Sequence, residues 1–432
     1  MEYTEFSAPA LRGIAIHRPN ERVFECMLSI DAWNGDGSVQ GAAVALLYSD
    51  ALLSGCEEYT RDELTDEISL LGGTLDISLS AGRASFTLKG LREKRAKLMA
   101  IFAKVLLSPS IPARELARIK TTTINGLKNS KEDARSKAHM LFWNALYEKN
   151  DRLHSFSEDE LIAAIPSVSR AELRAFHAHV MSGMWIATLI SASEEADTSI
   201  TLLRSLRGKF AEETRPAPAR SIRRVPQQLS GALIESRQNI EFSIGAHMPL
   251  RYEDDDYYPF LFGLMVLGKW GGFAGRLMST VREKEGLTYG IYARAEMVTK
   301  FEEGDWRIMT FFAPDKAVQG LTSTLREIRL IKEKGITKEE FERFKTIDRT
   351  GEALLHDYVL RLASDTHNLQ LAGLSRAEIA ELKKSRERVK REEVNAALKK
   401  HLDLTKLVVG IAGPISAKEK ELAAILKKAA VQ

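Results

Sequence analysis

The sequence predicts an α+β fold of two homologous domains, each with an antiparallel or mixed sheet covered by helices on one face. Three observations support this: a repeat at about half the chain length, a proline-rich connector between its two copies, and the same order of elements in each half. The chain has 432 residues, of which 44% are apolar and 28% are charged. This length and composition are typical of a globular protein with one or more large buried cores.

The repeat joins residues 110–121, SIPARELARIKT, to residues 335–346, GITKEEFERFKT. Five positions are identical at a constant offset: Ile111/Ile336, Glu115/Glu340, Arg118/Arg343, Lys120/Lys345 and Thr121/Thr346. Each copy follows a charged amphipathic helix and begins another. A shift of about half the chain indicates two homologous halves rather than a solenoid of short repeats.

A proline-rich connector, residues 207–228, lies between the two copies and has no apolar periodicity. Pro216, Pro218 and Pro226 would break a helix and favour an extended chain. We therefore expect one domain over residues 1–217 and a second over residues 218–432. The alternative is that the connector is a long surface loop inside a single domain.

The first elements of each half are strands. Residues 22–32, RVFECMLSIDA, alternate between apolar and polar side chains, and their counterpart in the second half is QNIEFSIGAHM at 238–248. In each half we expect two helices, a hairpin and then further helices after this strand.

A helix and a hairpin follow the first strand of the N-terminal half. Thr60 and Glu63 form a capping box, and Gly72-Gly73 supplies the C-terminal stop of the helix. Residues 75–79 and 86–88 then alternate on either side of a glycine-containing turn, which predicts a hairpin.

Charge and cysteine content exclude several classes of function. The formal net charge of +3 comes from nearly balanced acids and bases, without the basic and aromatic stripe of a nucleic-acid surface. Cys26 and Cys56 are too few for a disulfide framework or a thiolate zinc site, so we expect two free thiols. No leader pattern and no long apolar run occur, so the chain as written is expected in the cytoplasm, or in the periplasm if a signal peptide was removed.

Residues 267–293, LGKWGGFAGRLMSTVREKEGLTYGIYA, are the most informative segment. A glycine-rich turn leads into a helix that stops at Gly286, so Arg282 lies in its last turn and Tyr289 on the strand that follows. Both side chains could then face one cleft. The structural alternative is that Arg282 complements the helix C-terminus and Tyr289 is an edge-strand aromatic. The glycines do not have the G-x-G-x-x-G spacing of a dinucleotide site.

This segment closely resembles the substrate-binding segment of the pitrilysin and insulinase superfamily of zinc peptidases, in particular the bacterial two-subunit type. The resemblance extends from about Arg12 to Pro414. It implies that Arg282 and Tyr289 reach a bound peptide, and that Gly271 and Gly272 belong to a glycine-rich loop that touches the substrate.

The zinc motif of that superfamily, H-x-x-E-H, falls on residues 46–50 of this chain and is degenerate. Leu46, Ser49 and Asp50 replace the two histidines and the glutamate, and the window of the third ligand contains Asn125 and Gly126. No other histidine pair has the spacing of a zinc ligand set. His177 and His179 are close in sequence, but residues two apart on a helix face different directions. We therefore expect no metal on this chain.

The resemblance implies a non-catalytic subunit of a heterodimeric zinc metallopeptidase, in which a paralogous H-x-x-E-H subunit contains the zinc. Arg282 and Tyr289 would bind a peptide or unfolded polypeptide and support the transition state at the partner's site. The alternative is a metal-free scaffold, or a peptide-binding protein of the same fold, with no role in proteolysis.

Overall fold

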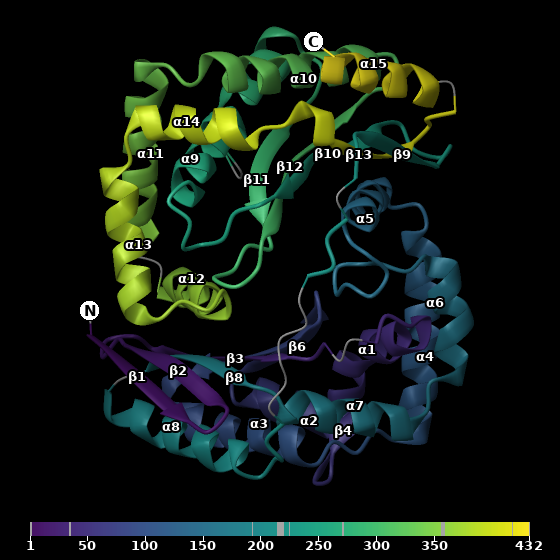
Figure 1. Ribbon diagram of the computed structural model, residues 1–432. Helices are drawn as coiled ribbons and strands as arrows, with labels where there is room; N and C mark the ends of the chain where they lie inside the picture. Colours follow the sequence, from purple (N-terminus) through teal and green to yellow (C-terminus); the bar gives the residue numbers. More distant parts are fainter. Residues whose placement is uncertain are drawn as a thin grey trace. The chain divides into compact units, whose positions relative to one another are not determined.

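The computed structural model describes residues 2–33, 36–191, 193–213, 220–223, 225–269, 272–355, 359–416 and 418–431. The chain forms two compact units (Figure 1). The first unit contains Met1–Lys128, Phe156–Pro218 and Leu355–Leu371. The second contains Asn129–Ser155, Ala219–Leu354 and Ala372–Gln432. Residues 214–219 of the proline-rich connector lie outside the described residues.

The first unit is built on a six-stranded mixed sheet with the order β1-β2-β8-β3-β7-β6, in which only β2 and β8 are parallel. Its strands are β1 (Glu2–Ala8), β2 (Leu11–His17), β3 (Val23–Asp31), β6 (Thr74–Ser80), β7 (Arg83–Leu91) and β8 (Trp185–Ser191). Strand β3 and the β6–β7 hairpin confirm the predicted elements. Strands β1, β2 and β8 were not predicted.

Helices cover one face of this sheet, either directly or by packing on the helices that do, and an apolar core lies between the sheet and these helices. They are α1 (Val39–Leu52), α2 (Arg61–Leu70), α3 (Arg95–Leu107), α4 (Ala113–Ser130), α6 (Glu158–Ala164), α7 (Arg170–Ser182) and α8 (Ser193–Arg207). A short ladder, β4 (Gly55–Cys56) with β5 (Tyr59–Thr60), precedes α2. Both cysteines are free and buried. Leu28 of β3 packs with Phe102 of α3 and Leu203 of α8 in one apolar cluster.

The motifs at the two ends of α2 form as the sequence predicts. The Thr60 hydroxyl accepts a hydrogen bond from the Glu63 backbone N–H at 3.4 Å, and the Glu63 carboxylate accepts one from the Thr60 N–H at 2.9 Å. After the helix, Gly72 has a φ of +64°, a left-handed conformation that glycine adopts without strain.

The second unit has a five-stranded sheet with the order β11-β12-β10-β13-β9, antiparallel except for β13 and β9. Its strands are β9 (Gln228–Leu233), β10 (Ile240–Met248), β11 (Ile291–Glu296), β12 (Gly304–Phe312) and β13 (Val408–Gly413). Its helices are α9 (Tyr257–Gly268), a π-helix (Met278–Lys284), α10 (Ala317–Lys334), α11 (Lys338–Leu355), α13 (Arg376–Arg388), α14 (Arg391–His401) and α15 (Glu419–Val431). The predicted α+β class, with two sheets covered by helices, is confirmed.

The sequence repeat has a structural counterpart in each unit. Helices α4 and α11 begin inside the two copies, and each has 18 residues. Each follows an amphipathic helix, α3 in the first half and α10 in the second. The order of strand, two helices, hairpin and further helices is therefore the same in both halves.

Each half of the chain contributes one helix to the unit that the other half forms. A single division between residues 217 and 218 does not describe this exchange. Helix α5 (Ala134–Leu146) packs on β13 of the second unit, on the face away from α9 and α14. A Cβ at Gly410 would lie 2.1 Å from the Ala138 carbonyl oxygen, so only glycine permits this close approach.

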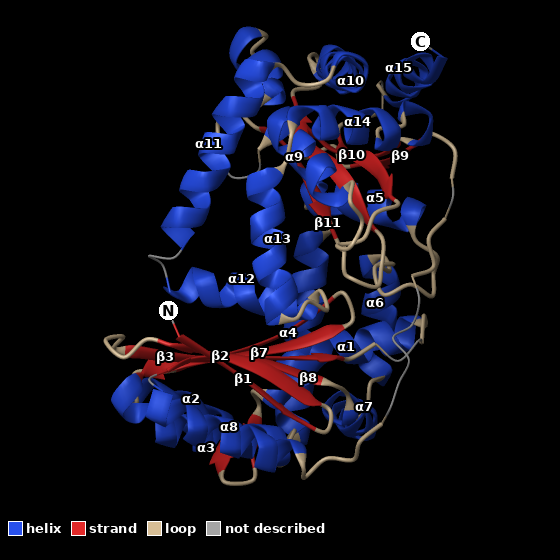
Figure 2. Ribbon diagram, turned by 60° about the vertical axis from the view of Figure 1, so that its left-hand side comes forward, coloured by secondary structure: helices blue, strands red, loops and turns tan. Residues whose placement is uncertain are grey.

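Helix α12 (Val359–Leu371) is the reciprocal case and packs on the first sheet (Figure 2). It lies on the face opposite to α3 and α8, where its Leu362 joins an apolar cluster from β2 and β8. The imidazole of His367 pairs with the Ser29 hydroxyl and, through its other nitrogen, with the Thr188 hydroxyl, both at 2.9 Å. Each sheet therefore has its main helical layer on one face and one exchanged helix on the other.

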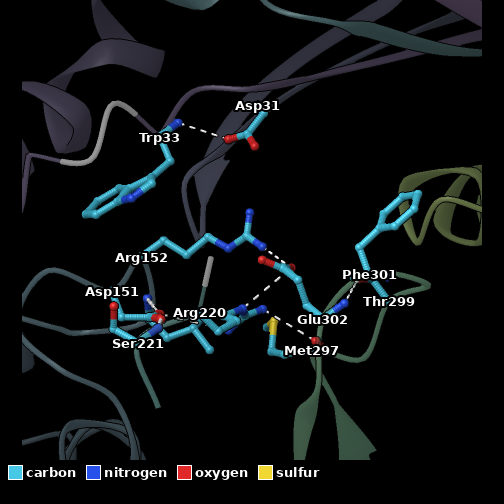
Figure 3. Close-up of polar contacts among 11 residues, drawn as sticks. Asp31, Trp33, Asp151, Arg152, Arg220, Ser221, Met297, Thr299, Phe301 and Glu302 are labelled. Carbon is cyan, nitrogen blue, oxygen red and sulfur yellow. Dashed lines mark hydrogen bonds and ion pairs between the residues drawn. The ribbon is translucent and has the colours of Figure 1, made fainter. Parts of the chain in front are cut away.

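Buried polar contacts fix the segment that follows α5 in the second unit (Figure 3). Arg152 forms an ion pair with Glu302, and the Arg220 guanidinium lies 3.5 Å from the same carboxylate. Asp151 accepts a hydrogen bond from the Ser221 backbone N–H at 2.8 Å. These contacts join the segment after α5 and residues 220–221 of the connector to the loop between β11 and β12.

No helix in the described ranges has the length and apolar character needed to cross a lipid bilayer.

Candidate functional site

The positions that match the zinc motif lie on α1 and α4 of the first unit. The Ser38 hydroxyl caps α1 by accepting a hydrogen bond from the Gly41 N–H at 3.0 Å. Leu46 and Asp50 are exposed on α1, and Ser49 is half-buried. Asn125 and Gly126 are exposed on α4, and nothing lies within 4 Å of the position of a Cβ at Gly126.

This donor set does not fit a catalytic zinc ion, which takes three protein ligands, usually histidine nitrogens and a carboxylate, and keeps one open position. Leu46 has no donor atom, although its side chain is 43% exposed where the family has a ligand. Asp50 is the only carboxylate at these positions. Over the parts of the chain that the structure describes, no group of three or more His, Cys, Asp or Glu side chains is arranged to hold a metal ion.

His177 has a packing role next to the degenerate motif, and it is separated from His179 by the helical twist of α7. Its Nε2 lies 2.8 Å from the Leu106 carbonyl oxygen, and its Nδ1 lies 2.9 Å from the Tyr48 hydroxyl. Because a carbonyl only accepts, Nε2 carries the proton and the Tyr48 hydroxyl donates to Nδ1. Burial lowers the pKa of His177, which keeps the ring neutral.

The second unit contains the glycine-rich segment, which starts at the end of α9. Gly275 has a φ of +118°, and a Cβ there would lie 2.9 Å from the Cα of Gly268. Glycine is therefore required for both the conformation and the close approach of the two ends of this turn. Gly272 is described, and an added Cβ there would meet the Lys269 side chain at 3.7 Å, an ordinary van der Waals contact. Gly271, which was predicted to touch substrate, lies outside the described residues.

The predicted helix follows the turn, and most of it is a π-helix. Residues 278–284 have this wider winding, with Leu277, Met278 and Val281 facing the core. Arg276, just before it, forms a bidentate pair with Glu340 of α11 at 2.6 Å and donates to the Gly335 carbonyl at 2.8 Å. Gly286 ends the helix with a φ of +61°, as predicted. π-helical turns are rare and occur frequently at functional sites.

Arg282 and Tyr289 lie side by side in the structure. The guanidinium carbon of Arg282 is 5.3 Å from the centre of the Tyr289 ring and 4.9 Å from the centre of the Phe273 ring. Both rings are exposed, Tyr289 at 71% and Phe273 at 64%. The guanidinium thus contacts two aromatic faces, and all three side chains can reach a ligand.

The placement of Tyr289 on a strand is wrong, because β11 begins two residues later at Ile291. Tyr289 lies in the turn between the π-helix and β11. The Thr288 hydroxyl accepts a hydrogen bond from the Gly290 N–H at 3.3 Å, and Lys316 donates to the Gly286 carbonyl at 2.9 Å. This turn displays the phenol more openly than a strand position would.

Phe273 was missed in the sequence analysis. The only signal for it was an aromatic residue inside a glycine-rich turn, where a large apolar side chain has no core to join. Its ring contacts the Arg282 guanidinium on one side, and a cation–π contact of this kind at an exposed site contributes about 0.5–1 kcal/mol.

Comparisons with known proteins indicate which proteins this chain resembles. Residues 167–347 match the family model described as the peptidase M16 inactive domain, and this range includes Arg282 and Tyr289. A curated relative, the non-peptidase homolog YmxG of Helicobacter pylori, is 20% identical over 405 residues, which is 90% of this chain and 89% of the relative.

Two solved structures are similar over nearly the whole chain. The peptidase M16 inactive domain from Pseudomonas fluorescens superposes with a TM-score of 0.82 at 22% identity, covering 96% of this chain and 98% of that one. A protease from Helicobacter pylori superposes with a TM-score of 0.81 at 11% identity, covering 95% and 99%. The family model, the curated relative and the Pseudomonas fluorescens structure are all described as inactive or non-peptidase, whereas the second solved structure is described as a protease. These comparisons confirm that the chain resembles peptidases of the M16 kind and their inactive homologues.

Proposed function

We propose that this chain is the non-catalytic subunit of a heterodimeric zinc metallopeptidase. In this proposal a paralogous subunit with an intact H-x-x-E-H motif supplies the zinc site, and this chain supplies Arg282 and Tyr289 to the peptide. The substrate is a peptide or an unfolded polypeptide. The match to an inactive-domain family and the unsuitable donors at residues 46–50 support the non-catalytic part of the proposal.

The single observation that carries the proposal is the exposed cluster of Arg282 between two aromatic rings. A guanidinium can donate two hydrogen bonds to a peptide carbonyl or a terminal carboxylate. The Tyr289 hydroxyl can donate to a carbonyl oxygen and stabilise negative charge as it develops. A helix-capping arginine and a packing tyrosine would not need an exposed phenol or a second exposed ring.

The test is peptide cleavage by the assembled heterodimer with Arg282→Ala or Tyr289→Phe in this chain. Removing one oxyanion donor typically lowers kcat by about 100-fold or more. We expect losses of that size while size-exclusion chromatography shows unchanged assembly. Arg251→Ala is the matched control, because Arg251 is an exposed arginine outside the cluster.

Undiminished cleavage by both variants would contradict the roles given to Arg282 and Tyr289. A heterodimer that assembles but cuts no peptide would favour the alternative, a peptide-binding or scaffold protein of the same fold. The degenerate donor positions on α1 and α4 are equally compatible with that alternative, so the cleavage assay distinguishes the two.

A further inference from the structure

The second unit has a pocket of about 260 Å³ beside the glycine-rich turn. Its walls come from α9, β11, α11 and α13. Most of the lining is apolar, and its main contributors are Leu261, Phe262, Met265 and Ala295. Pockets for drug-sized ligands have volumes of about 300–1,000 Å³, so this one suits a single apolar side chain and the group attached to it.

One wall of the pocket is polar, and its charged side chains form ion pairs. Asp348 accepts a hydrogen bond from the Tyr258 hydroxyl at 2.8 Å and pairs with Arg386 at 2.5 Å. The Arg386 guanidinium also lies 5.7 Å from the centre of the Tyr258 ring. On the opposite side, Arg294 of β11 pairs with Glu296. Glu296 also pairs with the buried Arg307, and Arg386 also pairs with Glu352. The two arginines that line the pocket therefore each have a carboxylate partner already.

Lys269 differs from the other charged residues of the pocket. It directly follows α9, and its backbone bridges to Ala293 of β11. Its side chain passes Gly272, where an added Cβ would lie 3.7 Å from the ammonium nitrogen. No carboxylate among the described residues forms an ion pair with this ammonium. The pocket therefore combines apolar walls with one available positive charge at the glycine-rich turn.

We infer that this pocket binds the C-terminal residue of a peptide, with an apolar side chain against α9 and β11 and the terminal carboxylate at Lys269. A leucine, methionine or phenylalanine end matches both the apolar lining and the single cation. The inference rests on the proposed function in one respect, because the choice of a peptide as the ligand comes from that proposal. It adds a second anchoring point in the same unit as Arg282, and this one selects for the chain end.

A direct binding experiment tests the inference with this chain alone, without a partner and without zinc. The probe is fluorescein-labelled Gly-Ser-Gly-Leu, titrated by fluorescence polarisation, in a free-acid form and a C-terminal amide form. We expect the free acid to bind at least fivefold more tightly than the amide, which corresponds to about 1 kcal/mol. Hexanoate, a small apolar acid, should displace the peptide only weakly.

Two variants probe the two features of the pocket. Lys269→Gln should lower the affinity for the free-acid peptide by at least fivefold and leave the affinity for the amide unchanged. Lys269→Arg should keep the preference for the free acid. Ala295→Leu should fill the pocket and weaken both peptides. Lys334→Gln removes the charge of an exposed lysine outside the pocket and should change neither affinity. Thermal melting of each variant verifies that it is folded.

Equal affinity for acid and amide, or free-acid binding unaffected by Lys269→Gln, would overturn the inference. Displacement by hexanoate at concentrations comparable to the peptide would overturn the peptide assignment, because it would identify a site for small acids. The binding experiment uses this chain alone, whereas the cleavage test uses the assembled heterodimer with zinc. A failure of the pocket would therefore leave the cleavage test of the proposed function unaffected.

Discussion

We expect the stability of the second unit to depend on pH through Asp305 of β12. It is fully buried, and its carboxylate accepts a hydrogen bond from the Tyr147 hydroxyl at 2.9 Å, next to the exchanged helix α5. Burial, with the charge of Glu296 as the next cause, raises the pKa of Asp305 from 3.8 to about 7. The folded chain therefore holds a proton that the unfolded chain releases at much lower pH.

The sign of the effect follows from the raised pKa. Because the folded state binds more protons between about pH 4 and pH 7, the free energy of unfolding falls as pH rises through this window. Each pH unit corresponds to about 1.4 kcal/mol, so the two units between pH 5 and pH 7 amount to ~3 kcal/mol for this group. Asp305→Asn keeps an acceptor for Tyr147 and cannot ionise.

Urea unfolding at pH 5, 6, 7 and 8 measures this difference. Between pH 5 and pH 8, the free energy of unfolding of wild type should fall by ~3 kcal/mol more than that of Asp305→Asn. The variant keeps a smaller pH dependence, because burial also raises the pKa of Glu296 to about 7. Asp315→Asn, at an exposed carboxyl group before α10, should follow wild type. Parallel curves for wild type and Asp305→Asn would refute the reasoning.

Three further predictions concern residues around the two candidate sites. Gly275→Ala should lower the free energy of unfolding by ~1–3 kcal/mol in urea titrations, because the residue has a φ of +118° and an added Cβ would press on Gly268. An unchanged free energy of unfolding would show that alanine is not strained at this position. Tyr48→Phe should lower the free energy of unfolding by ~1–3 kcal/mol in the same assay, because it leaves the buried Nδ1 of His177 without a hydrogen-bond donor. An unchanged free energy of unfolding would mean that a water molecule replaces the hydroxyl. Phe273→Ala should raise the KM of the assembled peptidase about two- to fivefold with little change in kcat, and an unchanged KM would show that Tyr289 alone holds Arg282.

Much of the fold could be predicted from local signals and from the repeat. The capping box at Thr60, the glycine stop at Gly72 and the alternation along β3 are short-range patterns that tertiary contacts reinforce here. The exchange of α5 and α12 could not be predicted, because neither helix differs in composition from one that stays in its own half. The evidence for it is a contact between Gly410 and Ala138, which are far apart in sequence.

The candidate site was predicted in part. The sequence indicated Arg282 and Tyr289 as a pair, and their side chains do lie together. It could not place Tyr289 in a turn, since a tyrosine flanked by Thr288 and Gly290 fits a turn and a strand end equally well. Phe273 and the pocket at Lys269 were also missed, because both depend on how the turn folds back past α9 and β11.

The most direct test of the central claim is peptide cleavage with zinc by this chain alone, by an H-x-x-E-H paralogue from the same genome alone, and by their mixture. The proposal predicts no cleavage by this chain alone and strong cleavage only in the mixture, with the mixture losing activity when this chain is Arg282→Ala. Cleavage by this chain alone would contradict the assignment as a non-catalytic subunit. A paralogue that is fully active without this chain would contradict the composite site.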